Sequence, residues 1–120
     1  MKGSIPSLAL VVEDDPLQRE FLCDLLRNEN LDVIQCESAE AAELVVARSG
    51  PELALLVTDY ALAGQGSGME LAQFAKRKFP RLNVILVSGQ DVLKPPANVR
   101  FLKKPFQPAE LLRAAMDPPL

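Results

Sequence analysis

The fold is decided by the apolar stretch LALLVTD at residues 53–59, which ends abruptly in the carboxylate of Asp59. A second apolar run at residues 8–12 ends in three acidic residues, and a later run that begins at residue 101 ends in two lysines. Buried parallel strands read as nearly continuous apolar runs, and their carboxyl ends share one edge of the sheet. We therefore predict parallel strands whose polar ends meet in one crevice, with at least three negative charges and one positive charge.

Extended and helical patterns alternate along the chain. Strands are predicted at residues 8–12, 32–36, 53–59, 82–87 and 99–102. Helices are predicted from Pro16 towards Asn30, from Ser38 to Ala47, from Ser67 to Phe79, and from Pro108 to Pro118-Pro119. This alternation indicates a parallel sheet with helices on both faces. The predicted fold class is α/β, a doubly wound five-stranded parallel sheet of the flavodoxin-like type, as a single domain over residues 1–120.

The apolar residues of the helices recur at helical spacing. In the first helix the apolar stripe comprises Leu17, Phe21 and Leu25, with Leu22 and Leu26 beside them. The core face of the second helix is predicted to hold Ala41, Leu44 and Val45. The third helix is expected to begin with a capping box, because Ser67 is followed three residues later by Glu70.

Composition excludes several functions. The chain has 13 basic and 16 acidic residues and no basic cluster with interleaved aromatic residues, which argues against a nucleic-acid surface. Histidine is absent, so His-based triads, imidazole metal sites and a phosphohistidine on this chain are excluded. No apolar stretch approaches the roughly 20 residues that span a bilayer, and no signal peptide is recognisable. We expect a cytoplasmic protein in which Cys23 and Cys36 are buried reduced thiols.

Four of the five predicted strand ends carry residues with useful chemistry, although each alone has a commoner explanation. Acidic residues before a helix often only cap it, and a lone Asp or Ser at a strand end is more often a turn residue. Their joint placement on one edge is much harder to obtain by chance. The candidates are the acids Glu13 and Asp14, the nucleophile Asp59, the hydroxyl of Ser88 and the cation Lys104.

These residues predict phosphoryl chemistry. Carboxylates about 4 Å apart repel by about 4 kcal/mol per pair at an effective dielectric near 20, so one takes up a proton or a divalent cation binds. An all-oxygen site with open positions favours Mg²⁺. A carboxylate beside it can attack a phosphoryl group and form an acyl phosphate, while a lysine and a hydroxyl stabilise the phosphoryl oxygens.

With these motifs, the chain resembles the receiver domain of two-component response regulators over essentially its whole length. VVEDDP at residues 11–16 resembles the acidic motif of the family, and LVTDY at residues 56–60 resembles its phosphorylation strand. VILVSG at residues 84–89 resembles the Ser/Thr strand, and FLKKPF at residues 101–106 resembles the aromatic-x-x-Lys-Pro-Phe segment. Together these motifs are highly specific.

The resemblance implies a metal-dependent phosphoacceptor. Asp59 is implied to receive a phosphoryl group from a histidine kinase or a histidine phosphotransfer protein, and to become an aspartyl phosphate. Asp14, Asp59 and the backbone carbonyl of Ala61 are implied to bind Mg²⁺, with Glu13 acting through a coordinated water. The domain is implied to catalyse only its own phosphorylation and dephosphorylation, and to act on a downstream protein target.

The resemblance also implies a switch. Ser88 is implied to hydrogen-bond the new phosphoryl group, and Phe101 to turn inward when Ser88 moves. Lys104 is implied to pair with the phosphoryl group. Strand alternation points the neighbouring Lys103 to the other side, and Pro105 identifies Lys104 as the match.

The chain departs from the family at several places. Ala63 stands where family members usually have proline. Residues 90–98 contain Pro95-Pro96 and little helical periodicity, so the fourth helix of the family is expected to be short or missing. Family members form their dimer and output face from the fourth helix, fifth strand and fifth helix. A short or missing fourth helix would change this face.

Three other functions are weighed against this one. An aspartate-nucleophile phosphatase needs a second Asp where Ala61 stands. A flavodoxin-like cofactor binder needs small residues after the first strand, where the acidic run at residues 13–15 would repel phosphate. A receiver-like scaffold that works without phosphorylation is disfavoured by the complete site and favoured by the shortened segment at residues 90–98. The start at Met1 favours a stand-alone regulator over a receiver from a larger protein such as a hybrid kinase.

Overall fold

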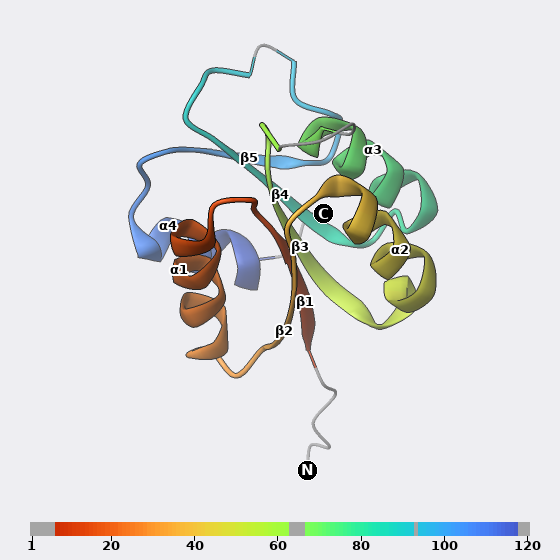
Figure 1. Cartoon of the computed structure of the whole chain (residues 1–120), viewed down its shortest axis with the longest axis horizontal. Helices are drawn as coiled ribbons and strands as arrows, with labels where there is room; N and C mark the ends of the chain where they lie inside the picture. Colours follow the sequence, from red (N-terminus) through yellow and green to blue (C-terminus); the bar gives the residue numbers. More distant parts are fainter. Residues whose placement is uncertain (1–6, 63–66, 93, 118–120) are drawn as a thin grey trace.

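The computed structural model describes residues 7–62, 67–92 and 94–117, in which strands and helices alternate (Figure 1). The strands are β1 (Leu8–Val12), β2 (Asp32–Cys36), β3 (Leu53–Asp59), β4 (Asn83–Ser88) and β5 (Arg100–Lys103). The helices are α1 (Pro16–Arg27), α2 (Ala39–Ser49), α3 (Gly68–Lys78) and α4 (Pro108–Met116), with a short 3₁₀ turn at Gly50–Glu52. The predicted alternation is confirmed. Ala63, Gly64–Gly66 and the helix end expected at Pro118-Pro119 lie outside the described residues.

The strands form one parallel sheet in the order β2-β1-β3-β4-β5. The chain runs from β1 outward to β2 and then crosses back to β3, so the strand order reverses between β1 and β3. At such a switch point the connections leave in opposite directions and open a crevice at the carboxyl ends of the strands. The predicted doubly wound sheet is confirmed, and this crevice lies where the acidic residues were expected.

Helices cover both faces of the sheet (Figure 1). On one face α1 and α4 pack against β-strand side chains that include Ala9, Val11, Val57 and Ile85. On the other face α2 and α3 pack against side chains that include Leu10, Val12 and Leu56. Because neighbouring side chains of each strand go to opposite faces, the central strands are buried on both sides and read as continuous apolar runs.

The helices begin at the capping residues that the sequence indicates. The carboxylate of Asp15 accepts a hydrogen bond from the backbone of Leu17 at 2.9 Å, and Pro16 occupies the first turn, where its missing N–H costs nothing. Ser67 and Glu70 form the predicted capping box, in which each side chain accepts from the backbone of the other. The first turns of α1 and α3 are therefore fixed close to the carboxyl edge of the sheet.

The buried faces of the first two helices differ from the prediction. In α1 the buried residues are Leu22, Cys23 and Leu26, whereas Leu17 and Phe21 are 79% and 47% exposed. In α2 the buried residues are Ala39, Ala42 and Val46. Ala41 and Leu44 are exposed, and Val45 is only partly buried. The helices carry more apolar residues than one face holds, and which of them is buried depends on how the helix is rotated against the sheet, which spacing alone does not determine.

The connection from β4 to β5 contains no helix in its described residues, 89–92 and 94–99. The expected loss of the fourth helix of the family is thus confirmed for this part of the chain. An exposed ion pair between Lys103 and Asp91, with 2.7 Å between Nζ and Oδ1, links the connection to β5.

Two further expectations concern the thiols and the membrane. Cys23 and Cys36 are free and buried, as predicted, and burial raises the pKa of both thiols. Within the described residues, no helix has the length and apolar character required to span a bilayer.

Candidate functional site

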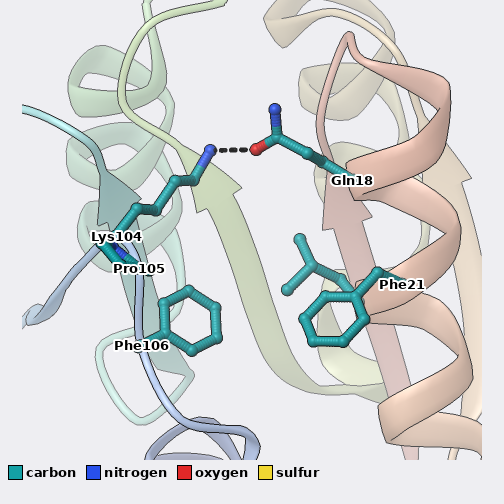
Figure 2. A pocket seen from close by; sticks show the side chains of 6 residues that line it. Gln18, Phe21, Lys104, Pro105 and Phe106 are labelled. Atoms are coloured by element: carbon teal, nitrogen blue, oxygen red, sulfur yellow. Dashed lines mark hydrogen bonds between the residues drawn. The ribbon is translucent and has the colours of Figure 1, made fainter.

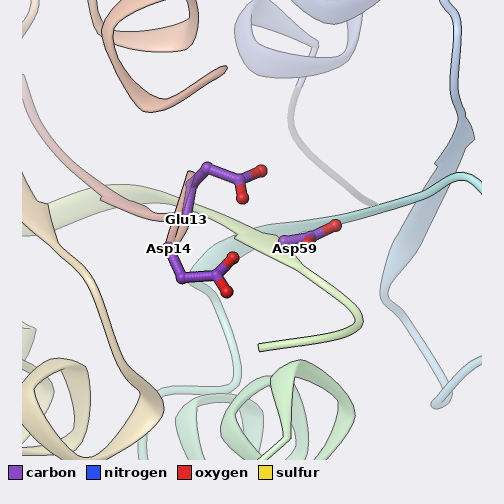
Figure 3. Close-up of side chains that lie close together, drawn as sticks. All are labelled: Glu13, Asp14 and Asp59. Atoms are coloured by element: carbon purple, nitrogen blue, oxygen red, sulfur yellow. The ribbon is translucent and has the colours of Figure 1, made fainter. Parts of the chain in front are cut away.

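Three carboxylates meet at the carboxyl ends of β1 and β3 (Figure 3). Glu13, Asp14 and Asp59 each offer a carboxylate oxygen, and these oxygens lie within 4.8 Å of one another. Glu13 is 1% exposed and Asp59 is 8% exposed, whereas Asp14 faces solvent. The parallel pairing of β1 with β3 brings Asp59 to the two acids that follow β1, since Val12 lies opposite Thr58.

Lys104 supplies the positive charge of this crevice. Its Nζ lies 3.1 Å from Oδ1 of Asp59 and 3.3 Å from Oε1 of Glu13. The backbone N–H of Lys104 donates to the carbonyl of Ser88 at 2.7 Å, which holds the residue at the end of β4. Lys103 pairs with Asp91 instead, so Lys104 is the lysine of this pair that faces the acids.

The acids and the lysine shift one another's pKa. Burial raises the pKa of Asp59 above its ordinary value, and the hydrogen bond and charge of Lys104 only partly offset this. Burial also raises the pKa of Glu13, opposed by a hydrogen bond from the backbone of Asp15. For Lys104, burial lowers the pKa, but the hydrogen bonds and charges of Asp59 and Glu13 outweigh burial and raise it overall. One lysine therefore does not compensate the buried negative charge.

The other predicted residues lie around this centre. Ser88 is the buried last residue of β4, and its Oγ accepts a hydrogen bond from the backbone of Gln90 at 2.9 Å. Phe101 is partly buried in β5, where it pairs in register with Leu86. Ala61 lies two residues beyond Asp59 in the exposed bend after β3.

Gly68, at the start of α3, permits this helix to approach the phosphoacceptor candidate. A Cβ atom at Gly68 would collide with the backbone carbonyl oxygen of Asp59. The backbone N–H of Gly68 donates to the carbonyl of Tyr60 at 3.0 Å, which ties α3 to the end of β3. The residue at this position must be glycine for α3 to pack here without moving Asp59.

Sequence reasoning missed two residues of α1 that support the site. Arg19 donates from Nη1 to the backbone carbonyl of Glu13 at 2.8 Å and from Nε to Oε1 of Gln35 at 3.2 Å. Gln18 accepts a hydrogen bond from Nζ of Lys104 at 2.6 Å. A signal for Gln18 was present, because Gln18 lies three residues after the helix cap Asp15, in the turn of α1 nearest the carboxyl edge of the sheet.

The donor set of the crevice is suited to a hard divalent cation. It consists of carboxylate oxygens, two of them from residues that are almost completely buried and whose pKa values burial raises. Carboxylate oxygens are the ligands that Mg²⁺ and Ca²⁺ prefer in proteins. A buried carboxylate next to a lysine and a cation can also act as a nucleophile towards phosphorus.

Comparisons with known proteins agree on one family. Residues 9–116 match the response regulator receiver domain. A response regulator receiver protein of Anaeromyxobacter sp. (strain Fw109-5) is 34% identical over 104 residues, which are 86% of this chain and 42% of that protein. The response regulator FleR of Pseudomonas aeruginosa is 30% identical over 109 residues, 86% of this chain and 22% of that protein. The chain thus spans less than half of either relative.

The fold is similar to that of solved receiver structures. The crystal structure of a response regulator receiver protein from Sinorhizobium medicae WSM419 superposes with a TM-score of 0.85 at 22% identity, covering 92% of each chain.

Proposed function

Because the chain belongs to the response regulator receiver domain family of two-component signal transduction, we propose that it accepts a phosphoryl group on Asp59 and thereby controls the binding of a partner protein. The observation that carries this proposal is the 3.1 Å contact between Lys104 Nζ and Asp59 Oδ1 within a buried acidic crevice. Receiver domains are regulatory phosphoacceptors, and we propose that this one catalyses only its own phosphorylation and dephosphorylation.

The proposed step transfers one phosphoryl group from a phosphohistidine to Asp59. A carboxylate oxygen of Asp59 attacks the phosphorus atom, the new O–P bond forms as the N–P bond breaks, and the histidine nitrogen keeps the bonding electrons. Lys104 lies where the negative charge of the phosphoryl oxygens develops, and the Ser88 hydroxyl donates a hydrogen bond to one of them. Hydrolysis by water then releases inorganic phosphate and restores the Asp59 carboxylate.

We propose that the acidic crevice holds Mg²⁺ through Asp14, Asp59 and the backbone carbonyl of Ala61, with Glu13 acting through a coordinated water. The all-oxygen donor set and the excess of negative charge over the single Lys104 ammonium support this assignment. When bound, the cation supplies positive charge that neutralises both the carboxylates and the incoming phosphoryl oxygens. The residues of the chain keep the roles of nucleophile and of hydrogen-bond donors.

We propose Ser88 and Phe101 as the switch. Ser88 and Phe101 lie on the neighbouring strands β4 and β5. Ser88 lies two residues beyond Leu86, the register neighbour of Phe101, and therefore on the same face of the sheet. Phe101 is only partly buried, so it has room to change its packing. Since phenylalanine has no hydroxyl, the switch acts by packing alone.

The proposed partners follow from this chemistry. A histidine kinase or histidine phosphotransfer protein supplies the phosphoryl group, and a downstream protein reads the phosphorylated state. We propose that residues 1–120 act as one receiver domain, which the match over residues 9–116 supports. A cytoplasmic location fits the two free buried cysteines, and we assign no role to nucleic acid or membrane contacts of this domain.

A receiver-like scaffold that works without phosphorylation is the second candidate. The observation that favours it is the absence of a helix from the described residues between β4 and β5, where the family forms its output face. The two candidates differ in whether Asp59 is ever phosphorylated.

The test is the intact mass of the protein after incubation with Mg²⁺ and acetyl phosphate. We expect one added phosphoryl group on the wild type, and none on Asp59→Asn or after chelation of the metal. The variant keeps the shape of the side chain and removes the nucleophilic oxygen. A wild-type protein that stays unmodified under conditions that preserve acyl phosphates would favour the scaffold.

A further inference from the structure

The ammonium group of Lys104 has a third acceptor besides the two buried carboxylates (Figure 2). Its Nζ donates to Oε1 of Gln18 at 2.6 Å, a shorter distance than those to Asp59 and Glu13. A lysine ammonium group has three N–H donors. Each donor therefore has an acceptor, and these come from three elements: the end of β1, the end of β3 and the first turn of α1.

Asp15 determines which way the Gln18 amide faces. Nε2 of Gln18 donates to Oδ2 of Asp15 at 3.1 Å, while Oδ1 of the same carboxylate accepts from the backbone of Leu17 and caps α1. The opposite amide orientation would place its NH₂ group against the Lys104 ammonium and its oxygen against a carboxylate. Both contacts would be repulsive, so the two neighbours together select the orientation in which the carbonyl faces Lys104.

The groove on this side of Lys104 offers no replacement for Gln18. Lys104 borders a groove lined by Gln18, Phe21, Leu22, Lys104, Pro105 and Phe106. Among these described lining residues, Gln18 alone has a side chain that accepts hydrogen bonds. Without the Gln18 carbonyl, the third N–H of Lys104 would turn to water and the long lysine side chain would regain conformational freedom.

We propose that Gln18 is a positioning residue that acts through Lys104 to speed the phosphorylation of Asp59. The inference rests on the function proposed above. A positive charge lowers the barrier most when it already lies where negative charge develops, and lysine is a flexible point charge that depends on its neighbours for placement. Because Gln18 is neutral, it orients the ammonium group without competing with the phosphoryl oxygens for its charge.

The test is a double-mutant cycle on the rate of phosphorylation by acetyl phosphate with Mg²⁺, followed by intact mass. Gln18→Met keeps the length of the side chain and removes the amide. We expect it to slow phosphorylation roughly threefold to tenfold when Lys104 is present, since a hydrogen bond to a charged group is lost. When Lys104 is already replaced by Met, Gln18→Met should not slow phosphorylation further. Gln73→Met, a matched change on the exposed face of α3, should leave the rate unchanged.

The outcomes separate this inference from the proposed function. A Gln18→Met protein that is phosphorylated as fast as the wild type would overturn the inference. So would an equal loss of rate in both backgrounds, because a general structural role does not depend on Lys104. If the wild type takes up no phosphoryl group, the proposed function fails. A second measurement then tests whether Gln18 holds the Lys104 ammonium group.

This second measurement is the exchange of the Lys104 ammonium protons with water, followed by NMR on the unphosphorylated protein. The Lys104 signal is identified by its loss in Lys104→Met. We expect exchange to be several-fold faster in Gln18→Met than in the wild type. Equal exchange rates would show that Gln18 does not hold the ammonium group, and would overturn the inference.

Discussion

Gly68 constrains the backbone of the site although it carries no side chain. It lies in the first turn of α3, and any side chain there would meet the carbonyl oxygen of Asp59. Glycine inside a helix ordinarily costs about 1 kcal/mol relative to alanine. Here the packing of α3 close against β3, which glycine permits, contributes more stability than this helix propensity costs.

We predict that Gly68→Ala destabilises the protein by about 2 kcal/mol, because the added methyl group forces α3 or the end of β3 to move. Denaturant unfolding measures this change. The matched control is Gly89→Ala, where an added Cβ meets nothing within 4 Å and no loss of comparable size is expected. A gain in stability for Gly68→Ala, as helix propensity alone predicts, would show that the close approach is not rigid.

Residue chemistry also explains why the site is costly to fold. Glu13 and Asp59 are nearly buried, and burial raises the pKa of both groups, so their ionised forms are disfavoured in the folded protein. Lys104 compensates only part of this charge. The site is therefore prepared for a further positive charge, which is the physical basis of the proposed metal binding.

At the scale of elements, α4 is attached to the sheet by a buried polar contact. Nδ2 of Asn83, at the start of β4, donates to the carbonyls of Ala114 at 2.9 Å and Ala115 at 3.3 Å, in the last turn of the helix. Arg100 of β5 contacts Asp117, directly after the helix. These contacts satisfy carbonyl groups that have no partner within the helix, and they hold α4 against the strand that leads to Ser88.

We predict that Asn83→Asp lowers the free energy of unfolding by about 2 kcal/mol or more at neutral pH. The substitution keeps the shape of the side chain but replaces a buried donor by a carboxylate facing two carbonyl oxygens. Hydrogen exchange should show the largest loss of protection in α4. Asn98→Asp introduces the same charge at an exposed position and should change stability by less than about 0.5 kcal/mol. Equal effects of the two substitutions would show that Asn83 does not hold α4 against the sheet.

The connection between β4 and β5 is the element in which this chain departs from its family. Its described residues contain no helix, and the exposed pair Lys103–Asp91 contributes little stability. In the described residues 89–92 and 94–99, no helix lies between β4 and β5, which carries Phe101. If the proposed switch of Ser88 and Phe101 operates, we expect its partner to bind a surface that lacks this helix.

At the scale of the whole molecule, stability and site occupancy are linked, because a ligand that binds only the folded state stabilises it. We predict that Mg²⁺ raises the free energy of unfolding of the wild type, by about 2.7 kcal/mol at a hundred times its Kd. Thermal unfolding with and without the metal measures this. A wild-type stability that does not respond to Mg²⁺ would contradict the assignment of the acidic crevice.

Asp59→Asn serves as the control for this measurement. Without metal we expect the variant to be more stable than the wild type by about 1 kcal/mol, because a disfavoured buried charge is removed. The pKa of Asp59 is raised in the folded state, so as the pH falls the Asp59 carboxylate is protonated at a higher pH in the folded wild type than in the unfolded chain. Protonation removes the unfavourable buried charge from the wild type. The difference between variant and wild type should therefore shrink towards acidic pH. With Mg²⁺, the stabilisation of the variant should be smaller than that of the wild type.

The sequence by itself determined the fold class, the sheet and the residues that meet at its carboxyl edge. Strand runs that end in Glu13, Asp59 and Lys104 carry this information because buried parallel strands must be apolar throughout and can place polar groups only at their ends. The capping residues Asp15 and Ser67 were equally readable, since a helix start is a local hydrogen-bonding pattern.

Only the tertiary structure decided which helix faces are buried and which neighbours hold the reactive groups. Leu17 and Leu44 have helical spacing yet are exposed, because the rotation of a helix is set by its packing against the sheet. Gln18 reaches Lys104 across 86 positions of sequence, and Asn83 reaches Ala114 across 31. Such contacts depend on distances between elements. A local pattern, such as the position of Gln18 three residues after the cap Asp15, does not encode those distances.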